Sequence, residues 1–286
     1  VAHSFPTRRS SDLSALLHAG ILNAGPFLIM RFAGVMEAAH LAPVLLIIGG
    51  GFTALFASVV LLTQPTVKVA LGYSSAAHMG FMLLVCGLGV YPAAVLHLVA
   101  HSFYKAHAFL SSGSVVDEAR AAAVAVPRRL HSPVRMLASL VGAGALYLGL
   151  AALLGLSPSE NPSLLLVGAV LVLGLTQLLA PALDAEGTPA GMARTTGLAA
   201  AVTLAFFALE EGTRTLLSTS VPAPVAPPVL VIALAVLVLT AFAATIFLQV
   251  TQLSVRPALR QRAYVMVRNG LYANALFDRL VGAYRR

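Results

Sequence analysis

The sequence predicts an all-α, polytopic integral membrane protein with about eight transmembrane helices and an amphipathic C-terminal helix. Three observations lead to this fold class. The 286 residues are 59% hydrophobic and only 10% charged, whereas soluble domains carry about 25% charged residues. The mean hydropathy is +0.90, and several uncharged stretches reach the ~20 residues that a spanning helix needs. So little polar surface cannot cover a water-soluble globule. This excludes a soluble enzyme and, despite the net charge of +8, a nucleic-acid-binding module.

Eight segments are candidates for spanning helices. Five carry no formal charge, and two carry isolated polar residues. The remaining segment, 195–217, is the least regular. Its uncharged run between Arg194 and Glu210 is, at ~1.5 Å per residue, shorter than the ~30 Å hydrocarbon core. Either Arg194 or the Glu210–Glu211 pair should therefore reach an interface or a wet cavity. In chain order the segments are 14–34, 41–63, 69–90, 92–113, 136–156, 162–183, 195–217 and 229–250.

The basic residues predict the orientation in the membrane. With eight spans, most arginines fall on one side, which the positive-inside rule makes cytoplasmic. That side receives Arg120, Arg128, Arg129, Arg135, Arg194 and the arginines of the tail. We therefore expect a multi-pass protein of the cell inner membrane, with both ends of this chain in the cytoplasm.

The ends of the chain differ from its apolar body. The string FPTRRSSDL within residues 1–13 resembles translated sequencing adapter, so we expect a non-native leader there, preceding a fragment of a larger protein. Apolar residues recur every four positions near the C-terminus, which is typical of an amphipathic helix. This helix could lie at an interface, dock on a partner, or form a solvated tail. The expected organisation is a leader (1–13), a channel core (14–115), a cytoplasmic loop (116–135), distal transmembrane helices (136–250) and an amphipathic cytoplasmic tail (251–286).

The fourth predicted span carries a stripe of titratable side chains. His97, His101 and Lys105 are spaced i, i+4, i+8, which places them on one helix face. Each such group costs at least a few kcal/mol at bilayer depth, so the stripe should face the bundle interior or a water path. Closely spaced groups that take up and release protons are what proton hopping requires. Two alternatives remain: a metal site, for which no third ligand is evident, and structural hydrogen bonding.

The third predicted span offers a second set of polar groups. Lys68 is followed by Tyr73, Ser74, Ser75 and His78 in one otherwise apolar segment. Only two of the 18 basic residues are lysines, Lys68 and Lys105, and a desolvated lysine can release its proton whereas arginine does not. Lys68 could instead be an interfacial anchor.

Two further polar sites stand out along the chain. In the first span, His18 and Asn23 lie beside Gly20 and a Gly25–Pro26 pair, which predicts a kink next to protein or water. Near the end of the seventh span, Glu210 and Glu211 lie close to Arg214, and a surface ion pair is the favoured interpretation.

Two strings of the sequence resemble a known family. Residues 68–80, KVALGYSSAAHMG, are followed by His97-x3-His101-Ser-Phe-Tyr-Lys105, and residues 14–19 read SALLHA. These strings resemble the proton-translocating antiporter-like membrane subunits, which include complex I subunit 5 (L) and the large Mrp sodium/proton antiporter subunit. The resemblance is specific over about residues 14–115. It implies that His18, Lys68, His97, His101 and Lys105 lie on a proton path, to which we add Tyr73, Ser74 and His78 from their place in the third span.

Within this family, residues 104–114, YKAHAFLSSGS, look most similar to DabB-type membrane subunits of inorganic carbon uptake systems. The resemblance implies a proton- or cation-conducting subunit that is not an enzyme by itself. Lys105 would be the proton carrier, His97 and His101 relays, and Lys68 a gate. The implied partner is a large soluble DabA-like subunit that holds zinc, with no cofactor or metal in this chain. The alternatives are a proton-pumping complex I subunit and an Mrp-type antiporter subunit.

Overall fold

The computed structural model describes residues 5–112, 133–156, 162–183, 188–222, 227–251 and 257–283. All the regular secondary structure in these ranges is helical, which confirms the all-α prediction. The predicted cytoplasmic loop at 116–135 lies almost entirely outside the described residues. The structure continues a helix through residues 5–13, and the non-native origin of the leader stays a prediction.

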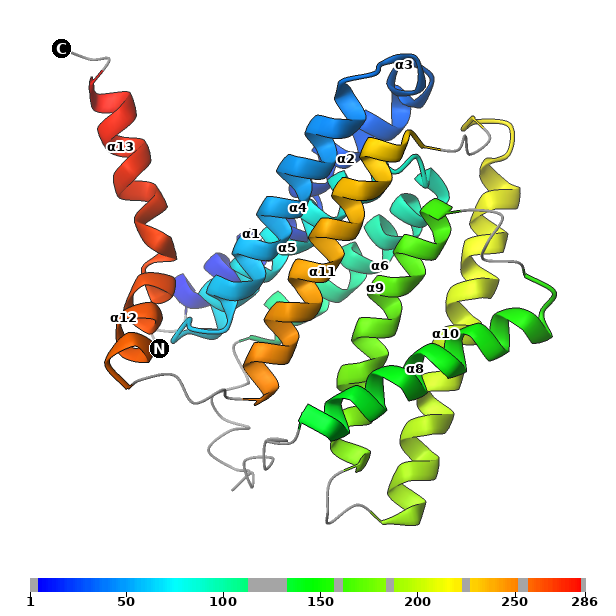
Figure 1. Cartoon of the computed structure of the whole chain (residues 1–286). Helices are drawn as coiled ribbons and strands as arrows, with labels where there is room; N and C mark the ends of the chain where they lie inside the picture. Colours follow the sequence, from blue (N-terminus) through cyan, green and yellow to red (C-terminus); the bar gives the residue numbers. More distant parts are fainter. Residues whose placement is uncertain are drawn as a thin grey trace.

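The first part of the chain forms one half of the bundle (Figure 1). Its long helices are packed consecutively, with α4 against α5 and α5 against α6, while α1 lies against α6. In order, the elements are α1 (Phe5–Ala19), η1 (Ile21–Asn23), α2 (Ala24–Arg31), α3 (Ala33–Ala38), α4 (Ala42–Leu61), α5 (Val67–Gly87) and α6 (Tyr91–Ser111).

The distal helices form the other half. α11 packs on α4 as well as on α9 and so joins the two halves, while α8 crosses α9 and α10 steeply (Figure 1). The elements are α8 (Pro133–Leu153), α9 (Pro162–Leu179), η3 (Ala180–Leu183), α10 (Pro189–Leu217) and α11 (Val229–Thr251).

Seven of the helices have the length and apolarity of membrane spans. They are 12–31, 42–61, 67–87, 133–153, 162–179, 189–217 and 229–247. The one predicted span missing from this set is the fourth, 92–113, which corresponds to α6 and has 21 residues. The physical reason is its content of three histidines and Lys105, which is the same feature that singles it out functionally.

Helix α10 contains the predicted seventh span and is longer than the uncharged run between Arg194 and Glu210. It begins at Pro189, capped by the Thr188 hydroxyl, which accepts a hydrogen bond from the Gly191 N–H at 3.1 Å. Its 29 residues extend about 43 Å at ~1.5 Å per residue, which exceeds the ~30 Å hydrocarbon core. Arg194 therefore lies inside a helix long enough to span the core, and the uncharged run alone does not set its length.

The predicted kink in the first span is confirmed. The helix breaks into a 3-10 turn at Ile21–Asn23, between α1 and α2. Asn23 Nδ2 donates to the Ala19 carbonyl at 2.8 Å and to Ser102 Oγ on α6, also at 2.8 Å. The break thus gives the first span a polar contact with the helix that carries the histidines.

The C-terminal tail forms two short helices joined by a turn. The helices are α12 (Pro257–Arg268) and α13 (Ala273–Ala283), and the 3-10 turn between them is η4 (Gly270–Tyr272). Gln64 Nε2 donates to the Arg268 carbonyl at 3.3 Å, which ties the turn to the α4–α5 connection. Beyond it α13 stands away from the bundle (Figure 1), and Leu276, Phe277 and Leu280 are exposed.

Glycines bring α4 and α5 into backbone contact. A Cβ added to Gly50 would lie 2.6 Å from the Gly80 carbonyl oxygen, and the reverse substitution gives the same distance. Small residues at a helix–helix contact permit this approach, which is typical of membrane bundles. The contact fixes α5, so that its polar face turns toward α6.

Substituting Gly50 tests this contact. Gly50→Val should destabilise the folded protein by about 1–3 kcal/mol, because the added methyl groups meet backbone rather than flexible side chains. Gly49→Val is the matched control, since a Cβ there meets nothing within 4 Å. The measurement is thermal unfolding in detergent micelles. Equal unfolding temperatures for the two variants would contradict the packing described here.

Candidate functional site

Lys105 lies at the centre of the polar residues in the bundle. Its side chain is 0% exposed, and Nζ donates to Ser74 Oγ at 2.8 Å and to the Leu71 carbonyl at 3.2 Å. Both acceptors belong to α5, and no carboxylate forms an ion pair with Lys105 among the described residues. A buried ammonium whose acceptors are all neutral has no fixed counter-charge, so it is held in place without being locked in its charged form.

Three imidazoles continue from Lys105 along the α5–α6 contact. His78 Nδ1 and His97 Nε2 are 3.0 Å apart, so one ring must donate the hydrogen and the other accept it. The ring of His101 lies 5.2 Å from that of His78 and 6.4 Å from that of His97, between centroids. His101 is only 3% exposed, and neither ring nitrogen has a hydrogen-bond partner among the described residues.

His18 joins this group from a third helix. Its ring stacks on Phe109 of α6, with 4.6 Å between centroids. A Cβ on Gly72 would lie 3.9 Å from His18 Cε1, so His18 also lies over α5. We refer to His18, His78, His97, His101 and Lys105 as the lysine–histidine cluster. It assembles residues that are up to 87 positions apart, counted from His18 to Lys105.

Two other residues of the predicted proton path, Tyr73 and Lys68, lie outside the lysine–histidine cluster. Tyr73 lies about 100° around α5 from Ser74, and its hydroxyl is 3.2 Å from a Cβ built on Gly270 of the tail. Lys68 is half-buried at the second position of α5, on the helix face of Leu71 and Ser75. Tyr73 is therefore not brought together with Lys105, whereas Ser74 contacts it directly.

Two contributors to the site have no clear signal in the sequence. The Leu71 carbonyl is a backbone group, and it accepts hydrogen bonds both from the Ser75 hydroxyl at 3.0 Å and from Lys105 Nζ. Ser102 accepts from Asn23, and its hydroxyl donates to the Leu98 carbonyl at 2.9 Å. Its position beside His101 could have indicated a polar role, but serine in a helix more often bonds only its own backbone.

A cavity of about 780 Å³ opens on one side of the cluster. Ser74, His78 and His97 form its polar wall, and apolar side chains from α9, α10 and α11 form the opposite wall. Lys105 and His101 do not line it. Ser74, the hydroxyl acceptor of Lys105, and the His78–His97 pair therefore lie between the buried lysine and the cavity.

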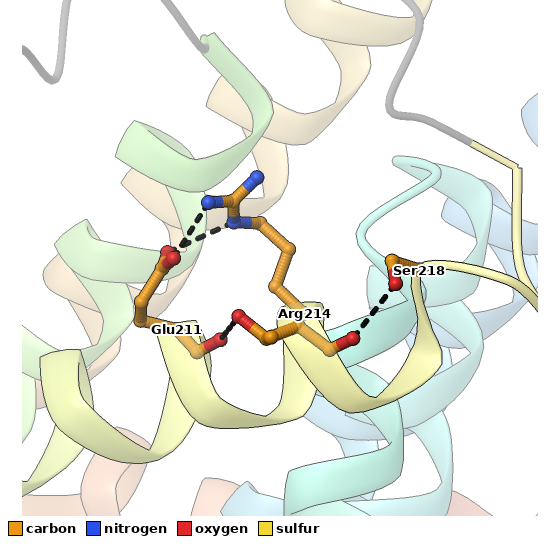
Figure 2. Close-up of polar contacts among 4 residues, drawn as sticks. Glu211, Arg214 and Ser218 are labelled. Carbon is orange, nitrogen blue, oxygen red and sulfur yellow. Dashed lines mark hydrogen bonds and ion pairs between the residues drawn. The ribbon is translucent and has the colours of Figure 1, made fainter.

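The glutamates near the end of α10 have different surroundings. Arg214 donates through Nε and Nη2 to the two carboxylate oxygens of Glu211, at 2.8 and 2.6 Å, on the exposed surface (Figure 2). The predicted surface ion pair is thus confirmed for Glu211. It is wrong for Glu210, which is only 8% exposed and takes no part in it.

The fold and the site define a helical, multi-pass membrane protein with a buried lysine and several imidazoles inside the bundle. The transmembrane family model "NADH:quinone oxidoreductase/Mrp antiporter" matches residues 8–159, more than half of the chain. The chain belongs to this family. All five residues of the lysine–histidine cluster lie within the matched region.

Relatives in two groups match the chain. "Probable inorganic carbon transporter subunit DabB2" of Halothiobacillus neapolitanus is 37% identical over 94% of this chain and 49% of its own length. "Probable inorganic carbon transporter subunit DabB" of Hydrogenovibrio crunogenus is 41% identical over 57% and 31%. "NADH-quinone oxidoreductase subunit L" of Rickettsia typhi is 38% identical over 37% and 16%. The chain thus spans about half the length, or less, of these relatives.

The Lys105–Ser74 hydrogen bond can be tested by stability. Ser74→Ala should cost about 1–3 kcal/mol, because a buried donor loses an acceptor. Ser139→Ala is the control, since this buried serine lies on α8 and its hydroxyl donates to the Arg135 carbonyl of its own helix. In a Lys105→Met background the cost of Ser74→Ala should disappear, as a double-mutant cycle of unfolding temperatures would measure. An unchanged cost there would mean that Ser74 stabilises something other than Lys105.

Proposed function

We propose that this chain is part of the proton- or cation-conducting membrane subunit of an inorganic carbon uptake complex. The observation that carries the proposal is the lysine–histidine cluster, in which a fully buried amine is held by neutral acceptors beside three imidazoles. Ionisable groups inside a membrane bundle are costly, and they mark ion or proton pathways by default. The identity with DabB-type relatives supports the choice of complex.

In this proposal Lys105 is loaded and unloaded with a proton. Loss of the proton leaves a neutral amine, which the dry surroundings tolerate better than an uncompensated charge. His101 then passes the proton toward the His78–His97 pair, where a change of tautomer reverses which ring donates. His18 borders the same path. Lys68, at the start of α5, gates the exchange of protons with the cytoplasmic side.

The proposal extends to the assembly around this chain. We infer a large soluble, zinc-bearing DabA-like partner, to which the conducted cation delivers the free energy for hydrating CO2 to bicarbonate. The proposed setting is the inner membrane, with both ends of this chain cytoplasmic, which the positive-inside distribution of arginines supports. The zinc and the hydration chemistry belong to the partner.

A second candidate is a proton-pumping subunit of an NADH-quinone oxidoreductase, with the Mrp-type antiporter as a variant of it. The observation that favours it is the 38% identity to a subunit L over 107 residues. That stretch covers less of the chain than the DabB2 match. Growth of a carbon-uptake-deficient host at ambient CO2 separates the two functions, because only the first candidate restores it.

Substitution of Lys105 tests the conduction step in the full-length protein. Lys105→Ala and Lys105→Arg should both abolish rescue of growth at ambient CO2, because neither side chain can take up and release a proton. His107→Ala is the control, because this histidine of the same helix is exposed and lies outside the cluster. Rescue by the arginine variant would show that a fixed charge suffices, and proton transfer through Lys105 would be refuted.

A further inference from the structure

Glu210 is a buried carboxyl group that the proposed proton path does not use. It lies on α10 and is 8% exposed, whereas its neighbour Glu211 has a side chain 51% exposed. The Nε and Nη2 groups of Arg214 both donate to the carboxylate of Glu211 (Figure 2). Among the described residues no hydrogen bond or ion pair reaches the Glu210 carboxylate. Arg214 is therefore hydrogen-bonded to Glu211 and not to Glu210, although its charge lies near both glutamates, and Glu210 is buried against the bundle.

The surroundings of Glu210 are aromatic, with one polar group. Tyr147 of α8 is 4% exposed and packs against Phe207 with the two rings tilted, 5.1 Å apart between ring centroids. Phe207 lies about one turn before Glu210 on the same face of α10, so the Tyr147 ring packs on the helix face that carries the carboxyl group. Gly168 of α9 makes room for the tyrosine, since a Cβ there would collide with the Tyr147 hydroxyl. Three helices thus enclose a carboxyl group and a phenol.

The position of Glu210 along its helix matches the end of the lysine–histidine cluster. His97 lies about 9 Å from the start of α6 and Glu210 about 10 Å from the end of α10, at ~1.5 Å per residue. In the eight-span topology these two helix ends lie on the same side of the membrane. Figure 1 shows the start of α9 and the end of α10 at one end of the bundle. Glu210 is therefore at a depth similar to that of His97.

The cavity reaches from His97 to the part of α10 that adjoins Glu210, although Glu210 itself does not line it. His97 is part of one wall, and Phe206 and Leu209 of α10 are part of the other. Because charged side chains are costly in lipid, we place the exposed Glu211–Arg214 pair at the membrane–water interface. A proton that leaves the His78–His97 pair toward the non-cytoplasmic side would therefore meet the buried carboxyl group of Glu210 before it reaches the Glu211–Arg214 pair.

We propose that Glu210, supported by Tyr147, is the proton-exchanging group through which the conduction path opens to the non-cytoplasmic side. The inference rests on the proposed function, because it needs a proton flux through Lys105. It assigns different roles to two adjacent glutamates: Glu210 takes up and releases protons, and Glu211 anchors the helix end at the membrane surface through Arg214.

The experiment compares Glu210→Gln with Glu211→Gln in the full-length protein with its partner subunit, reconstituted in proteoliposomes. Proton flux is followed with an internal pH-sensitive dye, and thermal unfolding is recorded for each variant. Glu210→Gln should lower the flux at least ~10-fold without lowering the unfolding temperature, and Glu210→Asp should restore part of it. Glu211→Gln should keep flux within about twofold.

Infrared difference spectroscopy on a pH step gives an independent readout. The wild type and Glu211→Gln should show the C=O band of a protonated carboxyl group, which Glu210→Gln should lack. Normal flux in Glu210→Gln, or a loss of flux accompanied by a lower unfolding temperature and no rescue by Glu210→Asp, would overturn the inference. If the wild type itself carries no protons, the proposed function fails. If the wild type conducts, Lys105→Ala does not, and Glu210→Gln does, only the role of Glu210 is refuted.

Discussion

The free-energy cost of keeping an amine inside an apolar bundle determines much of this structure. Lys105 is fully buried, and a lone ammonium in such surroundings would cost several kcal/mol. The Ser74 hydroxyl and the Leu71 carbonyl offset part of that cost from the neighbouring helix. Both are neutral, so the amine remains stable in either protonation state. This requirement explains why α5 carries a polar face in an otherwise apolar segment.

The fold class and most helices could be predicted from composition and hydrophobic length alone. Where the prediction differed, polar content was the reason. Helix α6 falls outside the apolar spans because His97, His101 and Lys105 lower its hydropathy, and α10 extends past Arg194 because helical structure does not stop at a charge. The sequence of a single helix shows which charged and polar residues it carries. Whether each of these side chains is buried or exposed depends on how the helix packs against its neighbours.

The candidate site was predictable in its residues but not in its contacts. Spacing placed His97, His101 and Lys105 on one face, yet it could not pair His78 with His97 across two helices. Tyr73 is the neighbour of Ser74 in the sequence, but its side chain reaches Gly270 of the tail and not Lys105. Glu210 and Glu211 are adjacent in sequence and equal in chemistry, so only the rotation of α10 against α8 distinguishes a buried from an exposed carboxylate.

The glycine contact between α4 and α5 has a mechanical consequence. Because backbone atoms of the two helices touch at Gly50 and Gly80, no compressible side chain lies between them, and the two helices must translate and rotate as one stiff body. Ser74 belongs to that body, whereas Lys105 belongs to the adjoining helix. Any rearrangement that releases the amine from its hydroxyl acceptor must therefore occur along the seam between α5 and α6.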